Sequence, residues 1–425
     1  MARIVLTTWG SLGDLHPFLA VAIELQRRGH TAVVATLPSW RDNVERAGVE
    51  FRPVRPDAPA SESDARELIR KVLDARSGPQ FLFTGLLGPG IRDAYDDTLA
   101  AAEGADLLVS HQLPQTAPIV AARTDIPWVS AIVAPMGFIS AYDPPTPPQA
   151  PALRGLIAAH PLVGKAFTGL VRLVSDRWMA PVYRLRAELG MEKGGHPLFE
   201  GQHSPARVLA LFSPLFGEKQ PDYPPQTVVT GFPFYDAAPT RPADPELTRF
   251  LDDGEAPVVF TLGSSAVWVA DDFYQVSVEA VRSLGRRALL LVGDDPAALR
   301  GQVPAGIGVF AYAPHALEMP RSSVIVHQGG VGTTAQALRS GRPSLVVPFG
   351  QDQPDNARRA VRLGVARTIS RGQYRVKRVA RELTALLAPD YAVRAAAVGD
   401  RIRAERGAER AADEVENVLR GRFAA

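Results

Sequence analysis

Cysteine is absent from this sequence of 425 residues. That absence excludes disulfides, thiol nucleophiles and metal sites built on cysteine. No apolar run approaches the ~20 residues that a membrane-spanning helix needs. The apolar run near the start is ended by Gly10 and Asp14 and is too short for the core of a signal peptide. We therefore expect a cytoplasmic protein without a transmembrane segment.

An excess of charge of one sign is also missing, since 47 basic residues stand against 45 acidic ones. The net charge of +2 gives no reason to expect nucleic acid or an anionic membrane as the main partner. Apolar residues make up 46% of the chain, enough for well-buried cores. A chain of this length is expected to form two domains rather than one.

Short apolar runs of strand length alternate with segments of helical periodicity along both halves of the sequence. This rhythm is typical of α/β domains with doubly wound, parallel sheets. The strands expected in the first half lie at 3–8, 31–36, 49–54, 105–110 and 127–133, and those of the second half at 257–263, 287–293, 308–312, 323–329 and 343–350.

Proline and glycine are concentrated at 216–247, which is the composition of a linker. We place the domain boundary there, giving an N-terminal domain of residues 1–235 and a C-terminal domain of residues 236–425. The segment from 375 is predicted to form helices rich in Arg and Glu. These terminal helices could pack back on the N-terminal domain.

The sequence "HQGGVGTT", residues 327–334, follows a predicted strand and opens a helix. Thr333 and Gln336 have the spacing of a capping box, which predicts that the helix starts there. The glycines before it leave backbone N–H groups open, and such a helix N-terminus binds anions. His327 could donate a further hydrogen bond. The alternative is a tight turn beside a histidine of the core.

Other strand ends of the second half carry small, polar or aromatic residues. Ser264 and Ser265 follow the strand at 257–263, and Tyr312, at the end of the strand at 308–312, could stack on a base. Asp352 and Gln353 follow the strand at 343–350 and could bind sugar hydroxyls. Ligands of such sheets bind outside the carboxyl ends of the strands. The strands at 257–263, 308–312 and 323–329 are expected to be neighbours, so their ends predict one pocket. For Asp352 the alternative is a helix cap.

The first half offers a second turn of this kind, "WGSLGDLHPF", at residues 9–18. Gly10 and Gly13 let the backbone turn tightly under a ligand, and Pro17 suits the first turn of the helix that follows. Asp14 could accept a proton from a substrate hydroxyl, or it could only cap the helix, as could Ser11 or His16.

An acceptor wall is expected from 134–140 and from the apolar helices near 152–180. Met136 and Phe138, together with Phe167 and Trp178, suggest a hydrophobic acceptor. Each of these four side chains could equally belong to an ordinary core.

Several stretches together carry a family resemblance: "GSLGDLHPFLAVAIELQRRGH", "TGFPFYD", "VFTLGSS", "FAYAPHAL", "VHQGGVGT" and "DQPDNARRAVRLG". Nearly the whole chain resembles the family 1 glycosyltransferases of GT-B fold. It is most similar to bacterial rhamnosyltransferases of the rhamnolipid type, and more loosely to sterol and glycopeptide-antibiotic glucosyltransferases. The resemblance implies two Rossmann-like domains facing across a cleft, the first for the acceptor and the second for a nucleotide-sugar donor.

The resemblance also implies roles for single residues. The pyrophosphate would be held by His327 and by the backbone from Gly330 through Gly332 and Thr333 to Thr334, with Ser264 or Ser265 beside it. Tyr312 and Ala313 would meet the base, and Asp352 and Gln353 the donor sugar. His315 stands where plant members carry a ribose-binding glutamine. The resemblance also implies that Gly13 contacts the donor.

In the first half, the resemblance makes Asp14 the base where other members carry histidine. His111 then stands where those members carry the partner aspartate, so the pair looks exchanged; a satisfied surface or pocket residue is the alternative. His16 is a competing base. No Asp-x-Asp occurs in the sequence, so a metal-bridged donor site has no support and no metal ligand or cofactor is expected.

The expected activity is inverting transfer of a hexose from a UDP- or dTDP-sugar to a hydroxyl of a lipophilic small molecule or lipid. A nucleotide-sugar 2-epimerase and a non-catalytic nucleotide-sugar binder are the alternatives. An oxidoreductase ranks lower. It would need a Gly-x-Gly-x-x-Gly pattern after a strand and an acidic residue ~20 positions later, and this pattern is missing. The sequence names neither the sugar, the base, the acceptor nor the oligomeric state.

Overall fold

The computed structural model describes residues 1–59, 61–236, 244–293 and 296–421. They form two compact units. Unit 1 comprises Met1–Ala65, Arg76–Tyr235 and Glu405–Ala425, and unit 2 comprises Arg66–Ala75 and Asp236–Ala404. Part of the predicted linker, residues 237–243, lies outside the described residues.

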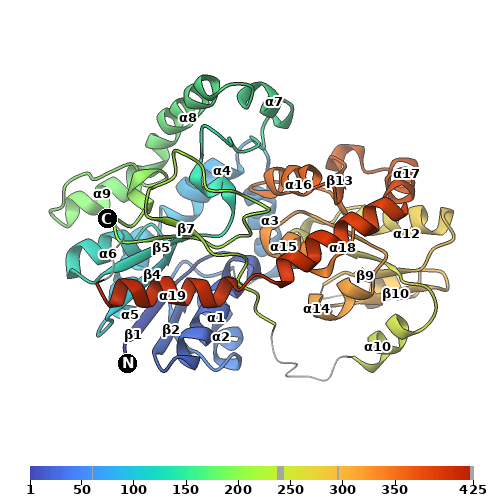
Figure 1. Ribbon diagram of the computed structural model, residues 1–425, viewed down its shortest axis with the longest axis horizontal. Coiled ribbons are helices and arrows are strands. Elements are labelled where there is room, and N and C mark those ends of the chain that lie inside the picture. Colours follow the sequence, from blue (N-terminus) through green and yellow to red (C-terminus); the bar gives the residue numbers. More distant parts are fainter. Residues whose placement is uncertain (60, 237–243, 294–295, 422–425) are drawn as a thin grey trace. The chain divides into compact units, whose positions relative to one another are not determined.

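Unit 1 is built on a seven-stranded sheet in the order β3-β2-β1-β4-β5-β6-β7, and every neighbouring pair is parallel (Figure 1). Its strands are β1 (Arg3–Thr7), β2 (Thr31–Thr36), β3 (Glu50–Pro53), β4 (Leu107–His111), β5 (Trp128–Ile132), β6 (Val208–Ala210) and β7 (Thr227–Val229). Strand β4 is buried along its whole length, as expected for a strand covered on both faces.

The helices of unit 1 follow the strands in α/β fashion. They are α1 (Leu12–Arg27), α2 (Arg41–Arg46), α4 (Gly78–Phe81), α5 (Ile91–Ala101), α6 (Ala117–Thr124), α7 (Arg154–Ile157), α8 (Pro161–Asp176), α9 (Ala180–Glu188) and α19 (Gly407–Leu419). A π-helical turn, η2, spans Leu82–Leu87, and 3-10 turns include η3 (Pro135–Phe138) and η5 (Arg177–Met179). Helix α3 (Glu62–Val72) begins in unit 1, and its residues from Arg66 onward belong to unit 2.

The C-terminal helix α19 packs alongside α1 in unit 1 (Figure 1). Arg28, at the end of α1, donates to Asp413 at 2.6 Å and to Glu24 at 2.8 Å. Glu416 of α19 lies 3.1 Å from the His30 ring. The last helix of the chain is therefore tied by ion pairs to the first helix.

Unit 2 has a six-stranded parallel sheet in the order β10-β9-β8-β11-β12-β13. Its strands are β8 (Val258–Thr261), β9 (Ala288–Leu291), β10 (Ile307–Phe310), β11 (Val324–His327), β12 (Ser344–Val346) and β13 (Ala366–Thr368). Its helices are α10 (Pro245–Asp252), α11 (Gly263–Ala266), α12 (Phe273–Ser283), α13 (Ala297–Arg300), α14 (His315–Glu318), α15 (Val331–Ser340), α16 (Gln353–Arg362), α17 (Val376–Leu386) and α18 (Pro389–Arg403).

These two sheets confirm the predicted α/β class, and three local expectations were wrong. Helix α15 starts at Val331 with Gly330 as its N-cap, so Thr333 lies inside the helix and is not its cap. Strand β10 is not a neighbour of β8, because β9 lies between them. Pro17 stands inside helix α1, beyond the first turn where it was expected.

No helix among the described residues is long and apolar enough to cross a bilayer.

Candidate functional site

Both sheets have a point where the strand order reverses, and ligands of open α/β sheets bind at such points. In unit 2 the reversal lies between β8 and β11, whose last residues Thr261 and His327 are paired in register. In unit 1 it lies between β1 and β4, where Thr7 pairs with Ser110. The residues that follow these four strands include most of the predicted site.

The turn after β11 is shaped so that only glycine fits at Gly329. Its φ is +92°, and a Cβ there would lie 2.8 Å from Val346 and 3.1 Å from the Gln353 carbonyl oxygen. The turn leads directly into α15, so the N–H groups of Gly332 and its neighbours belong to the first turn of a ten-residue helix. Such N–H groups have no partner inside the helix and can donate to an anion.

His327 is fixed as a neutral hydrogen-bond donor. Its ring is buried, and Nδ1 accepts a hydrogen bond from the Gly329 N–H at 3.1 Å. Burial is the main cause that lowers the pKa of His327 to about 3, and the nearby charge of His315 lowers it further. A neutral ring that accepts at Nδ1 carries its proton on Nε2. Nε2 is buried and has no hydrogen-bond partner among the described residues, so it can donate to a ligand oxygen.

Gln328 is a buried polar residue beside this turn that the sequence analysis did not identify. Its Nε2 donates to Thr333 Oγ1 at 3.3 Å, whereas its Oε1 has no partner among the described residues. Gly263, with φ of +63°, passes so close that a Cβ would lie 2.4 Å from Gln328 Nε2. The turns after β8 and β11 are thus packed directly on each other, with Ser264 and Ser265 following Gly263.

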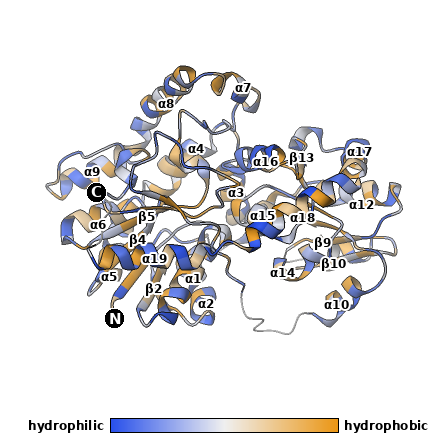
Figure 2. Cartoon of the chain, viewed as in Figure 1, coloured by the Kyte–Doolittle hydropathy of each residue, from blue (hydrophilic) through white to orange (hydrophobic). Residues whose placement is uncertain are grey.

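Helix α16 is strongly hydrophilic (Figure 2), yet several of its polar side chains are buried. Asn356, also missed from the sequence, donates to the Gly329 carbonyl oxygen at 2.9 Å and to Asp352 Oδ2 at 2.6 Å. Asp352 makes no side-chain cap for α16. Gln353 Oε1 accepts from the N–H groups of Phe349 and Gly350 at 2.8 and 3.3 Å. Asn356 therefore links Asp352 to the glycine turn.

The remaining predicted donor residues lie at the β10 end of the same sheet edge. Tyr312 is 65% exposed, and Ala313 is buried. His315 opens α14, and its Nδ1 lies 2.6 Å from Glu318 Oε1. The Tyr312 ring is exposed to solvent, so an aromatic ligand could stack on it.

In unit 1, Asp14 uses its two carboxylate oxygens differently. Oδ2 accepts from the Ser11 N–H at 2.8 Å and from Ser11 Oγ at 3.0 Å, completing a capping box at the start of α1. Oδ1 lies 3.8 Å from His111 Nε2. A Cβ on Gly10 would lie 2.4 Å from Oδ2, so glycine is needed there. The cap predicted as an alternative role exists, and it leaves the second oxygen facing His111.

His111 is the buried member of this pair. Its side chain is 1% exposed against 21% for Asp14. Burial lowers the pKa of His111, and the charge of Asp14 raises it only in part. Nε2 is buried without a hydrogen-bond partner among the described residues. A substrate can therefore reach Asp14 more readily than His111.

His16 lies two residues beyond Asp14 in α1, and residues two apart in a helix do not share a face. Its ring packs against Tyr235 at a centroid distance of 5.2 Å. It was the competing candidate for the base. The structure brings Asp14 to His111 and places His16 beside Tyr235.

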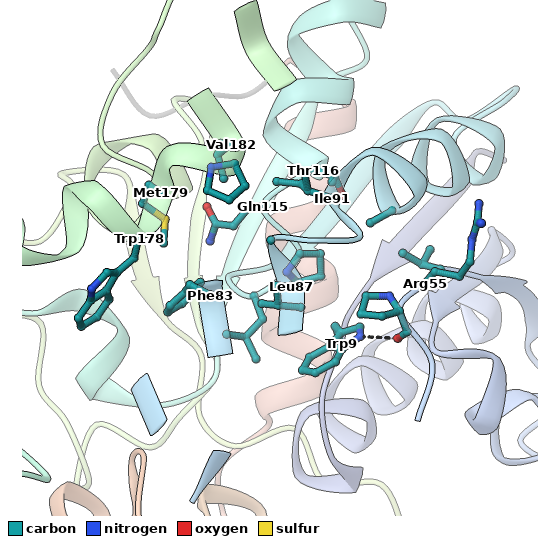
Figure 3. A pocket seen from close by; sticks show the side chains of 17 residues that line it. Trp9, Arg55, Phe83, Leu87, Ile91, Gln115, Thr116, Trp178, Met179 and Val182 are labelled. Atoms are coloured by element: carbon teal, nitrogen blue, oxygen red, sulfur yellow. Dashed lines mark hydrogen bonds between the residues drawn. The ribbon is translucent and has the colours of Figure 1, made fainter. Parts of the chain in front are cut away.

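An apolar pocket of about 30 Å³ lies in unit 1 (Figure 3). Figure 3 shows Trp9, Phe83 and Leu87 on one side and Trp178 and Met179 on the other. Trp9 directly precedes Gly10 and the Asp14 turn, and its Nε1 donates to the Pro56 carbonyl oxygen at 2.9 Å. The volume holds about two water molecules, so a larger ligand would need η2 or η5 to move.

Of the residues first expected to form an acceptor wall, Trp178 lines this pocket, whereas Met136, Phe138 and Phe167 do not. Phe138 is buried and stacks on Tyr223 at a centroid distance of 3.8 Å and on His203 at 5.6 Å. Met136 stands beside it in η3. Neither residue lines the pocket, and Leu170 and Leu173 of α8 face solvent.

Comparisons with known proteins agree with this architecture. Residues 4–82 match the glycosyltransferase family 28 N-terminal domain, and residues 279–420 match the erythromycin biosynthesis protein CIII-like C-terminal domain. The chain is 34% identical to an O-mycaminosyltylonolide 6-deoxyallosyltransferase of Streptomyces fradiae, covering 96% of each chain. It is 28% identical to a vancomycin aglycone glucosyltransferase of Amycolatopsis orientalis, covering 95% of this chain and 94% of the relative.

Solved structures show the same fold. The glycosyltransferase VinC, solved with dTDP, has a TM-score of 0.70 at 18% identity, with 99% of this chain and 100% of the other covered. The calicheamicin glycosyltransferase CalG4 has a TM-score of 0.68 at 19% identity, with 100% of both chains covered. The predicted GT-B class is confirmed: the chain belongs to the family 1 glycosyltransferases and is a transferase that uses a nucleotide sugar.

Proposed function

We propose that this enzyme transfers a hexose, with inversion, from a UDP- or dTDP-sugar to a hydroxyl of a lipophilic small molecule. Unit 2 binds the donor and unit 1 binds the acceptor and supplies the base. The observation that carries the proposal is the Asp14–His111 pair. One carboxylate oxygen is held by the helix cap, and the other lies 3.8 Å from His111 at the switch point of the first sheet.

The donor is held without a side-chain cation at the glycine turn. His327 Nε2 and the N–H groups at the start of α15 donate to the diphosphate, beside Ser264 and Ser265. Asp352 and Gln353 bind the sugar, and Tyr312 stacks on the base with Ala313 beneath it. Two solved structures of similar fold support a nucleotide donor, since VinC and the transferase SsfS6 were each solved with thymidine diphosphate.

The chemistry follows from these positions. The acceptor oxygen attacks the anomeric carbon of the sugar, and its proton passes to Asp14 Oδ1 while the bond to the diphosphate breaks. A positioned general base of this kind contributes ~10²–10⁴-fold. The leaving diphosphate is stabilised by preorganised N–H donors, which need no reorganisation at the moment of reaction. His111 remains buried and neutral in the free enzyme and can share the proton that Asp14 receives.

The acceptor's apolar body binds at the pocket of Trp9, Phe83 and Trp178. Aromatic and aliphatic side chains dominate its lining, which is typical of sites for apolar ligands. The relatives are named for O-mycaminosyltylonolide, vancomycin aglycone and sterol acceptors, which supports a small-molecule acceptor here. Phe138 is buried, and neither it nor Met136 lines this pocket.

The test is a panel of UDP- and dTDP-sugars incubated with the enzyme and a set of hydroxyl-bearing lipophilic acceptors. We expect a glycoside of inverted anomeric configuration from at least one donor. Epimerised donor without glycoside would indicate a 2-epimerase instead. Nucleotide binding with neither product would indicate a non-catalytic binder.

A further inference from the structure

Glu318, the last residue of α14, is a carboxylate buried beside His315. Its side chain is fully buried, and Oε1 lies 2.6 Å from His315 Nδ1, one turn earlier in the helix. The other oxygen, Oε2, is buried and has no partner within the described part of the chain. At this distance a proton lies between Nδ1 and Oε1, so only Nε2 of His315 can meet a ligand.

The pair lies at the ligand edge of unit 2. Helix α14 follows β10 after the short segment that carries Tyr312, and it packs against α15. His315 is near enough to His327 for its charge to lower the pKa of that residue. Since His327 belongs to the glycine turn, His315 lies near the proposed diphosphate site, and it follows Tyr312 by three residues along the chain.

Core packing alone does not explain a glutamate at this position. A buried polar atom without a hydrogen bond is unfavourable, and a leucine would fill a similar volume without that penalty. Burial raises the pKa of Glu318, which is the direction expected for a carboxylate with too few partners. Residues kept against stability in this way are commonly part of a functional site.

We propose that Glu318 is a positioning residue of the donor site, which orients the His315 ring so that Nε2 binds a ribose hydroxyl of the nucleotide. The inference rests on the proposed function, because a nucleotide donor is what brings a ribose to this edge. A hydroxyl both donates and accepts, so the contact forms whichever protonation state His315 has. Glu318 itself does not touch the ligand.

The experiment compares Glu318→Leu, Glu318→Gln and His315→Ala with the wild-type enzyme. Affinities for UDP and dTDP are measured by calorimetry, and the Tm is measured without ligand. We expect Glu318→Leu to weaken both nucleotides about 10-fold or more, as for partners that orient a ligating histidine. Its Tm should equal or exceed that of the wild type. Glu318→Gln can still accept from Nδ1, so it should retain part of the affinity.

The double variant of Glu318→Leu and His315→Ala should bind no more weakly than His315→Ala alone, since both act through one ring. Met319→Leu, at the neighbouring buried position, is the matched control and should leave nucleotide affinity unchanged. A lowered Tm with unchanged affinity in Glu318→Leu and Glu318→Gln would assign Glu318 a structural role and overturn the inference. A wild-type enzyme that bound neither UDP nor dTDP would instead contradict the proposed function, and the inference with it.

Discussion

Asp14 of α1 and His111 of β4 are 97 residues apart in sequence, and the structure brings Asp14 Oδ1 to 3.8 Å from His111 Nε2. The pairing of β1 with β4 places both residues at the switch point of the first sheet. Thr8 completes the contact, since its Oγ1 lies 3.5 Å from His111 Nδ1 and donates to the Asp14 carbonyl oxygen at 3.2 Å. Asp14 and His111, the proposed base and its partner, are therefore held near each other by the pairing of β1 with β4.

Replacing His327 should change the pH dependence of stability as well as donor binding. The folded-state pKa of about 3 lies below the ordinary value of ~6.5, so below pH 6.5 the unfolded chain binds a proton that the folded protein does not. Stability is thus lost as pH falls, by at most ~1.4 kcal/mol per pH unit from this residue.

We expect the Tm of His327→Gln to fall less than that of the wild type between pH 6.5 and pH 4.5. His203→Gln is the matched control, because burial also lowers the pKa of His203, to about 4, at a position away from the glycine turn. Both variants should flatten the curve, and only His327→Gln should lose affinity for UDP or dTDP. Equal nucleotide affinity in the two variants would remove His327 from the donor site.

Asp352→Ala and Gln353→Ala should weaken sugar recognition more than nucleotide recognition. Their place at the start of α16 lies beside the glycine turn, to which Asn356 connects Asp352. Affinities for the full nucleotide sugar and for the nucleoside diphosphate are compared in each variant. Equal losses for both ligands would indicate that the two residues support the turn and do not contact the sugar.

Transfer should proceed in an excess of chelator. The sequence has no Asp-x-Asp, and we propose that the N–H donors of α15 and His327 stabilise the leaving diphosphate. Turnover is measured with chelator and again after magnesium is added back. Loss of turnover that magnesium restores would show that a metal ion takes part.

Much of this fold could be predicted from sequence because parallel strands covered on both faces are continuous apolar runs. Most strand segments and the residues at their carboxyl ends followed from that pattern, whereas β6 and β13, of three residues each, were not predicted. The order of strands did not, which is why β10 was expected beside β8. The start of α15 was misplaced because Thr333 and Gln336 have cap spacing, whereas in the fold Thr333 is buried and accepts from Gln328.

The parts of the site that sequence missed depend on side chains meeting across the fold. Gln328 lies between His327 and Gly329 in sequence, and Asn356 lies one helical turn after Asp352. Their closeness to predicted site residues could have identified them as members of the site. Their buried hydrogen bonds were not visible without the structure. The apolar pocket could not be foreseen, because its lining is gathered from segments between Trp9 and Val182.

The most direct test of the account is the single-turnover rate of Asp14→Asn with saturating donor and acceptor. The amide oxygen can still accept from the Ser11 N–H, so the cap and donor affinity should survive while the base is lost. We predict a transfer rate lower by ~10²–10⁴-fold, with affinity for the nucleoside diphosphate close to that of the wild type. A near-normal rate in Asp14→Asn, together with loss of transfer in His16→Ala, would contradict the account and make His16 the base.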